Sequence, residues 1–166
     1  MGIGPVIDNG FYYDFLLPRP LTEADLTALE ERMAEIVKEN LPLEKFVEPR
    51  DVARKRCEDM GQPLKVKLID DLPDEAEISF YQQGDFIDLC KGPHIESTGR
   101  IGAFKLMSIA GAYWRGDEKN PMLTRIYGLA FDTKADLEAY RAQIEEAKKR
   151  DHRKLGKELK LFPFSD

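Results

Sequence analysis

Hydrophobic and polar positions in the first 40 residues follow two different periods. β-prone apolar runs flank Asp8-Asn9-Gly10, and an Asn-Gly step between such runs predicts a β-hairpin with a type I′ turn, since both residues tolerate positive φ. After Pro18-Arg19-Pro20 the period becomes helical. Thr22 and Asp25 are spaced as a capping box, so we predict a helix from Thr22 to about Asn40. Its expected apolar stripe is Leu26, Leu29, Met33, Ile36 and Val37.

From residue 43 onward, strand-length apolar runs dominate. We predict strands over 43–47, 64–69, 78–81, 86–90, 104–114 and 122–131, and one short helix over 50–60. The strand over 64–69 depends on the alternation of Leu64-Lys65-Val66-Lys67-Leu68. Most connections are too short for parallel crossovers, so the sheet should be mainly antiparallel. The pattern indicates an α+β fold with helices packed on a mainly antiparallel sheet.

A long helix is predicted at the C-terminal end. Thr133 can cap it, with Asp136 at the third helical position, and Leu137 begins a core face that ends near Ala147. Beyond Ala147 the sequence is almost all charge, which is typical of a helix that projects into solvent or contacts a partner. The basic residues that could lie along phosphates are Lys148, Lys149, Arg150, Arg153 and Lys154.

Composition narrows the class of protein. A chain of 166 residues with 42% hydrophobic and 34% charged residues suits one soluble globular domain, with or without a projecting element. No apolar run is long enough to span a membrane, and the 2 cysteines favour a reducing cytoplasm. The formal net charge of −6 argues against bulk attraction to nucleic acid but allows a local basic face.

Candidate chemistry is concentrated in the segment Asp88-Leu89-Cys90-Lys91-Gly92-Pro93-His94. Gly92-Pro93 interrupts any helix, so Cys90 and His94 must approach each other from a strand end and a loop. A buried cysteine beside a backbone-bonded histidine explains the spacing equally well. A zinc site is disfavoured because structural zinc needs four ligands, and Cys57 and His152 lie on predicted helices without matching partners.

Six segments taken together resemble the editing domain of bacterial threonyl-tRNA synthetase, which is related to the editing domain of alanyl-tRNA synthetase. The segments are Gly4–Phe15, Asp88–His94, Phe104–Met107, Ala110–Asp117, Leu123–Gly128 and Lys149–Gly156. They occur in matching order from about residue 2 to 162, which makes the resemblance specific. The Tyr113-Trp114-Arg115-Gly116-Asp117 segment favours the threonyl member.

The resemblance implies hydrolysis of serine wrongly esterified to threonine tRNA. Cys90 and His94 match the loop half of the editing pocket, Lys65 and Asp88 match positions that hold the substrate and position water, and Tyr13 matches a pocket wall. Cys90, His94, Lys65 and Asp88 are therefore the expected catalytic residues, and Tyr13 is the expected substrate contact. The threonyl type resembles a metal-free version of the site.

The resemblance also implies a division of the chain and a set of partners. Residues 1–132 should form the editing core without its His-x-x-x-His helix, and residues 133–166 should lead toward a ligase domain, so we expect a fragment with little or no activity alone. The parent would be a homodimeric ligase that uses ATP, magnesium and zinc and binds threonine tRNA and mischarged seryl-tRNA. Two alternatives are a non-catalytic tRNA-contacting module and a free-standing, zinc-dependent editing protein.

Overall fold

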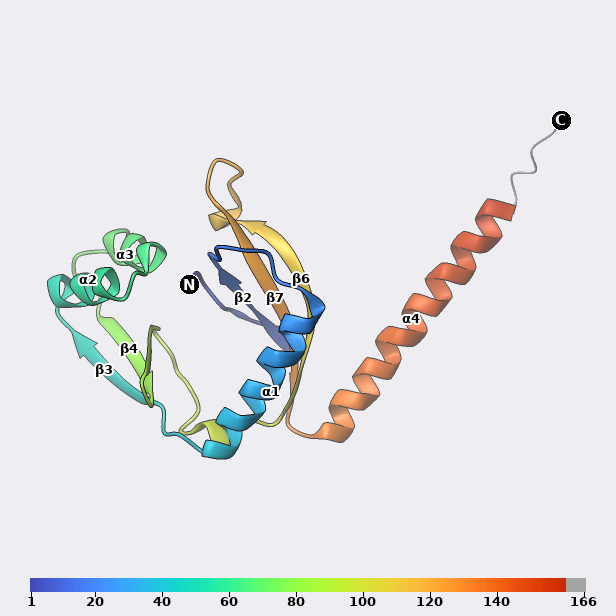
Figure 1. Cartoon of the computed structure of the whole chain (residues 1–166), viewed down its shortest axis with the longest axis horizontal. Coiled ribbons are helices and arrows are strands. Elements are labelled where there is room, and N and C mark those ends of the chain that lie inside the picture. The colour runs from blue at the N-terminus through green and yellow to red at the C-terminus, as the bar shows by residue number, and fades with distance from the viewer. Residues whose placement is uncertain (161–166) are drawn as a thin grey trace.

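The chain folds around two antiparallel sheets, which lie side by side in Figure 1. The computed structural model describes the backbone of residues 1–160 and the side chains of residues 1–155. The large sheet has the order β1-β2-β7-β6, and its strands are β1 Val6–Ile7, β2 Gly10–Phe15, β6 Ala103–Tyr113 and β7 Met122–Phe131. The small sheet has the order β3-β4-β5, and its strands are β3 Glu44–Glu48, β4 Ile78–Gln83 and β5 Phe86–Leu89.

Helices cover both sheets and complete the predicted α+β class. The α-helices are α1 Glu23–Glu39, α2 Arg50–Asp59, α3 Pro63–Asp70 and α4 Lys134–Lys160. Two short 3₁₀ turns are η1 Thr98–Arg100 and η2 Trp114–Gly116. The predicted antiparallel pairing is confirmed for every strand pair of the described residues. The strands form two sheets rather than the single sheet that the sequence suggested.

The large sheet and α1 pack through most of the predicted apolar stripe. Thr22 and Asp25 form the capping box, and Leu26 is buried against Leu106 and Ile126 of the sheet. The stripe is wrong at Leu29, which is 40% exposed, because the helix turns Glu30 toward the sheet, where it accepts from the Leu106 amide. The β1–β2 hairpin is confirmed, but its predicted type I′ turn is wrong, because only Asn9 has a positive φ, of 61°. Gly10 instead pairs with Ile7 in the hairpin. Only glycine fits at position 10, because a Cβ there would lie 2.0 Å from the Gly128 carbonyl oxygen.

The predicted strand over 64–69 is wrong, since these residues form α3. Pro63 occupies the first turn of the helix, where a proline costs no hydrogen bond and fixes a helical φ. The alternating sequence contains a second pattern, Leu64 with Leu68 four residues later, and tertiary packing selects it. One consequence is that Lys65 is buried while Lys67 stays exposed, whereas a strand would have placed both on the same face.

Helix α3 joins the two sheets. Its Leu64 and Leu68 pack with Trp114 and Leu123, which belong to the large-sheet side. Its Ile69 is fully buried in a separate core with Phe80 of the small sheet. Side chains of α3 therefore lie where the two sheets meet.

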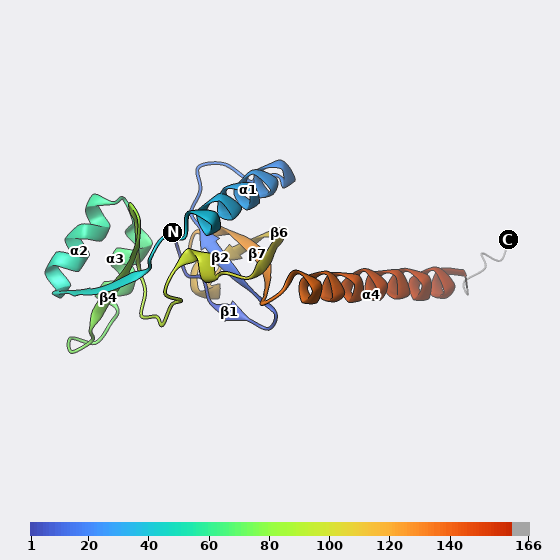
Figure 2. The ribbon, with the colours of Figure 1, turned by 90° about the horizontal axis from the view of Figure 1, so that it is seen from below.

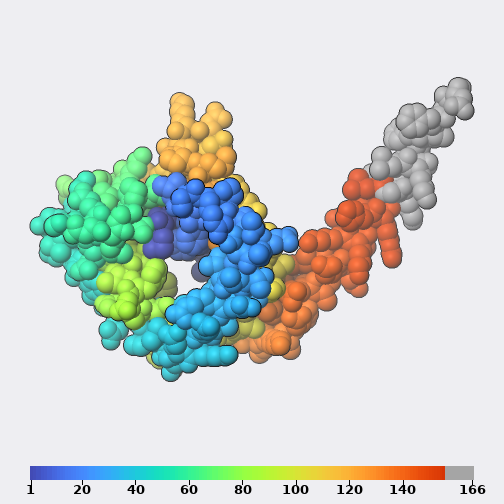
Figure 3. Space-filling view, in the orientation of Figure 1, coloured from blue at the N-terminus to red at the C-terminus, as the bar shows by residue number. Residues whose placement is uncertain are grey.

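The last helix leaves the body of the protein. Thr133 accepts a hydrogen bond from the Asp136 amide at 3.2 Å, as predicted, and Leu137 is buried. Beyond its first turns α4 extends away from both sheets (Figures 2 and 3). Within residues 1–160 no helix combines the length and apolarity needed to cross a membrane.

Candidate functional site

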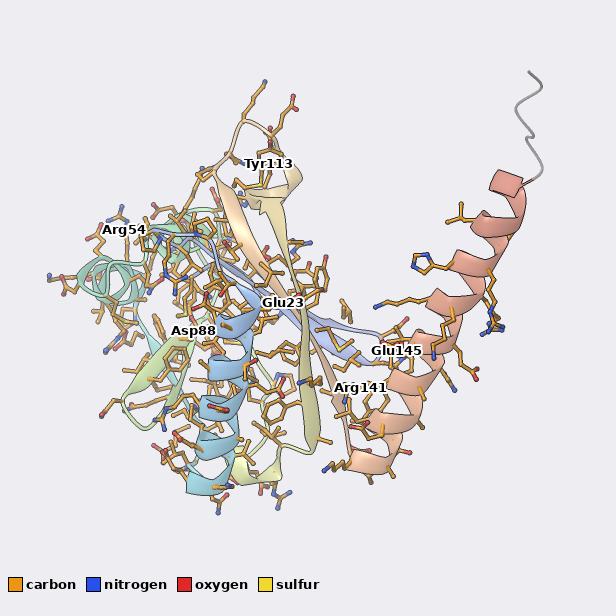
Figure 4. All side chains as sticks on the ribbon, turned by 45° about the vertical axis from the view of Figure 1, so that its right-hand side comes forward. Glu23, Arg54, Asp88, Tyr113, Arg141 and Glu145 are labelled. Atoms are coloured by element: carbon orange, nitrogen blue, oxygen red, sulfur yellow. The ribbon has the colours of Figure 1, made fainter. Side chains whose placement is uncertain are left out.

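Three side chains from distant parts of the sequence meet between the two sheets. Tyr13 comes from β2, Lys65 from the first turn of α3 and Asp88 from β5 (Asp88 is labelled in Figure 4). The Lys65 ammonium lies 3.0 Å from Asp88 Oδ1, and the Tyr13 hydroxyl donates to Asp88 Oδ2 at 2.7 Å. We call these three residues the ammonium cluster. The structure brings these three predicted site residues together, and their catalytic and binding roles remain predictions.

Each member of the ammonium cluster is fixed by its own element. Strand β2 is held to β7 by Asp14, which accepts two hydrogen bonds from Arg125 at 2.7 and 2.9 Å. The C-terminal end of α3 is capped by Arg50, whose guanidinium donates to the carbonyls of Ile69, Leu72 and Pro73. These contacts make the site a product of tertiary packing.

The lysine of the cluster is buried and its charge is paired. Lys65 is 4% exposed, and its Nζ donates to Tyr13 Oη at 3.2 Å and to the Leu89 carbonyl at 3.4 Å. Two hydrogen bonds and the ion pair with Asp88 thus compensate the buried ammonium. These contacts fix the position of the Lys65 ammonium.

Burial raises the pKa of the Tyr13 phenol well above its ordinary value, and the neighbouring Asp88 carboxylate raises it further. The phenol therefore stays protonated and acts as a donor. Oδ2 of Asp88 accepts the hydrogen bond from Tyr13, and Oδ1 faces the Lys65 ammonium, so lone pairs remain on the carboxylate. Asp88 can accept a further hydrogen bond from a substrate amine.

A second group, the thiol–imidazole pair, forms where β5 runs into the following loop. His94 Nε2 lies 3.0 Å from Cys90 Sγ, and the Gly92 amide points to the same sulfur at 3.4 Å. Cys90 is partly buried and His94 is exposed. Lys65 contacts the carbonyl of Leu89, the residue directly before Cys90, so the pair adjoins the ammonium cluster.

Comparison with known proteins identifies the domain type. Residues 78–127, which include β4, β5 and the thiol–imidazole pair, match the family described as "Threonyl and Alanyl tRNA synthetase second additional domain". This part of the chain is similar to that family. The resemblance to the editing domain of the synthetases is thereby confirmed.

Relatives over the whole chain favour the threonyl member. A threonine–tRNA ligase of Acetivibrio thermocellus is 62% identical over 162 residues, which are 98% of this chain and 26% of that protein. The ligase of Clostridium tetani is 60% identical over 166 residues, and that of Marinobacter nauticus is 56% identical over 164 residues, again with about 26% of each relative covered. The chain thus spans about a quarter of the length of the curated relatives it matches.

Two residues beside the thiol–imidazole pair were not predicted from the sequence, although strand register reveals them. Tyr81 is paired with Asp88 across β4 and β5, and the Ser79 hydroxyl donates to the Cys90 carbonyl at 2.7 Å. Directly opposed residues point to the same face of a sheet. Ser79, Tyr81, Asp88 and Cys90 therefore share one face, while Phe80 and Leu89 enter the core on the other.

An open cleft adjoins the thiol–imidazole pair. Its volume of about 730 Å³ lies within the range of small-molecule sites. The lining side chains that matter here come from α3, β4 and the loop after β5: Leu68, Ser79, Tyr81, Cys90, Lys91 and Pro93. A ligand in this cleft would contact Cys90.

The remaining predicted residues lie elsewhere. Lys148, Lys149, Arg150, Arg153 and Lys154 are exposed on the projecting part of α4. Arg141 and Glu145, labelled in Figure 4, mark the helix just before this basic segment. Among the described residues no group of three or more His, Cys, Asp or Glu side chains is arranged to hold a metal ion.

Proposed function

We propose that the domain hydrolyses the ester bond of seryl-tRNA formed by a threonine–tRNA ligase. The observation that carries the proposal is that the ammonium cluster adjoins the thiol–imidazole pair, whose Cys90 lines an open cleft. The chemical need is that threonine and serine differ by one methyl group, which yields only about 1–3 kcal/mol of discrimination in a binding pocket. A second, hydrolytic site removes the serine that escapes this discrimination.

In the proposed mechanism, Asp88 binds the α-ammonium of the seryl group through its remaining lone pairs. The positive charge of Lys65 stabilises the oxyanion that develops on the ester carbonyl. Its longest contact, 3.4 Å to the Leu89 carbonyl, is the one that the oxyanion would replace most easily. Tyr13 keeps the carboxylate oriented by donating to it.

The thiol–imidazole pair orients the attacking water and the ribose of the terminal nucleotide. As the water oxygen bonds to the carbonyl carbon, His94 accepts a water proton. The bond between the carbonyl carbon and the ribose oxygen then breaks, and that oxygen takes the same proton from His94, which returns to its starting state. The products are free serine and uncharged tRNA.

We further propose that α4 contacts tRNA phosphates through its exposed basic residues and leads toward the ligase part of a longer protein. That protein would join threonine to tRNA with ATP and act as a homodimer, as expected from the sequence. Residues 1–132 would form the editing core and residues 133–166 the connection. Loss of one phosphate contact should reduce the slope of log affinity against log salt concentration by about 0.9.

Serine release from seryl-tRNA tests the proposed hydrolysis. We would place this chain in the Clostridium tetani ligase in exchange for its matching segment, since the match covers all 166 residues. Lys65→Met and His94→Ala should each slow serine release about 100-fold, because each removes a group that acts on the transition state. Lys67→Met is the matched control, since Lys67 is exposed on the same helix. Hydrolysis at the unaltered rate in both site variants would refute the proposal.

The same assay separates the alternative functions. If the domain is only a tRNA-contacting module, the chimeric ligase would bind threonine tRNA in a salt-dependent way, and the domain would release no serine from seryl-tRNA. A zinc-dependent editing protein would lose activity on treatment with a chelator. The proposed mechanism predicts serine release that is insensitive to chelator.

A further inference from the structure

Tyr81 occupies a place next to the thiol–imidazole pair that has no assigned function. Its register partner is Asp88, so its side chain lies on the face of the small sheet that carries Cys90. It also lines the cleft beside Cys90. The ring is therefore close to reacting groups without belonging to the ammonium cluster.

The Tyr81 ring restrains His94. The two ring centroids are 4.3 Å apart and the planes meet at 89°, which is an edge-to-face contact. His94 is exposed and sits in a loop, and its Nε2 lies 3.0 Å from Cys90 Sγ. Without the tyrosine ring, the imidazole would be free to rotate away from the sulfur.

The loop backbone is shaped around the same ring. A Cβ placed on Gly92 would lie 2.2 Å from the Tyr81 hydroxyl oxygen. Gly92 also has a φ of +76°, in the left-handed region that favours glycine. Glycine thus allows the loop to pass close to Tyr81 and to return His94 to Cys90.

We propose that Tyr81 is a positioning residue that holds the His94 imidazole against the Cys90 sulfur. Its effect on hydrolysis rests on the function proposed above, whereas its effect on geometry does not. Displacing a catalytic group by about 1 Å can cost about 100-fold in rate. The contact is made by the ring, so phenylalanine should replace tyrosine and leucine should not.

Nuclear magnetic resonance tests the geometry directly in the 166-residue chain. The chain has only two histidines, so His152, exposed on α4, is an internal control for His94. Tyr81→Phe should keep the ring-current shift of the His94 protons and the nuclear Overhauser contact between His94 and the Cys90 β-protons. Tyr81→Leu should lose both and leave His152 unchanged. Persistence of the His94–Cys90 contact in Tyr81→Leu would overturn the proposal; if that variant does not fold, Tyr81→Met replaces it.

Serine release by the chimeric ligase supplies the second readout. Tyr81→Leu should lower kcat about 10- to 100-fold with little change in KM, and Tyr81→Phe should stay within about threefold of the parent. An unchanged kcat for Tyr81→Leu in an active chimera would overturn the positioning proposal alone. A chimera without any hydrolysis would overturn the proposed function, and the magnetic resonance result would still decide the positioning.

Discussion

The ammonium cluster and the thiol–imidazole pair are neighbours, but the fold makes them in different ways. The cluster joins β2, α3 and β5, and its Lys65 is almost completely buried. The thiol–imidazole pair is formed within five consecutive residues, and its His94 is exposed. The cluster is thus a tertiary feature, whereas the pair is a local one.

Because of this difference, substitutions in the two groups should affect protein stability and hydrolysis differently. A buried charge must keep its partners, because an unpaired one is costly, so changes in the ammonium cluster should affect folding as well as function. Changes at the exposed His94 of the local pair should affect function alone. The four predictions below test this distinction.

The largest effect is expected for Lys65→Met, which leaves the Asp88 carboxylate without its ammonium partner. The free energy of unfolding should fall by about 3 kcal/mol, since breaking a buried ion pair is strongly destabilising. Urea unfolding at pH 7 measures it. The matched control Lys67→Met should change it by less than about 0.5 kcal/mol. Equal losses in both variants would show that Lys65 is not paired as described.

Gly92→Ala tests the local pair through its loop. Gly61→Ala is the control, because Gly61 has a similar φ of +64° and no atom within 4 Å of the added Cβ. The left-handed conformation should cost both variants about 1 kcal/mol. Gly92→Ala should lose about 2 kcal/mol more, because its Cβ meets the Tyr81 hydroxyl. Equal unfolding free energies for the two variants would mean that Tyr81 does not pack against this loop.

Tyr13→Phe tests the ammonium cluster through the pH dependence of the free energy of unfolding. The pKa of Tyr13 is raised in the folded state, so above pH of about 10 the unfolded chain loses this proton first. The stability that depends on the protonated phenol is therefore fully present below pH 10 and declines as pH rises, by up to about 1.4 kcal/mol per pH unit. Unfolding from pH 9 to 11 should show the stability difference between parent and Tyr13→Phe shrinking with pH. A constant difference would contradict the raised pKa.

His94→Ala should have the smallest effect on stability. The side chain is exposed, so the free energy of unfolding should change by less than about 0.5 kcal/mol. Its hydrolytic loss in the chimeric ligase should nevertheless match that of Lys65→Met. A loss of stability comparable to that of Lys65→Met would remove the distinction between the two groups.

The same distinction explains what could be predicted from the sequence. The Cys90–His94 contact follows from a short spacing and a helix-breaking Gly92-Pro93, so local reasoning finds it. Capping and periodicity likewise give α1, α2, α4 and most strands to within a few residues.

Burial of Lys65 could not be predicted from its own segment. Residues 64–69, which include Lys65, alternate as a strand would. The same segment carries Leu64 and Leu68 at helical spacing, and packing of these two leucines with Trp114 favours the helix. The division into two sheets has the same origin, because it depends on which strands find partners far along the chain. Tyr81 was missed because its relation to Asp88 requires the strand register.

A double-mutant cycle on seryl-tRNA hydrolysis tests most directly whether the ammonium cluster and the thiol–imidazole pair form one catalytic site. Serine release would be measured for the chimeric ligase with Lys65→Met, with His94→Ala and with both. Groups that act in one site are non-additive, so the double variant should be within about threefold of the slower single variant. Losses that multiply in the double variant would contradict a single site.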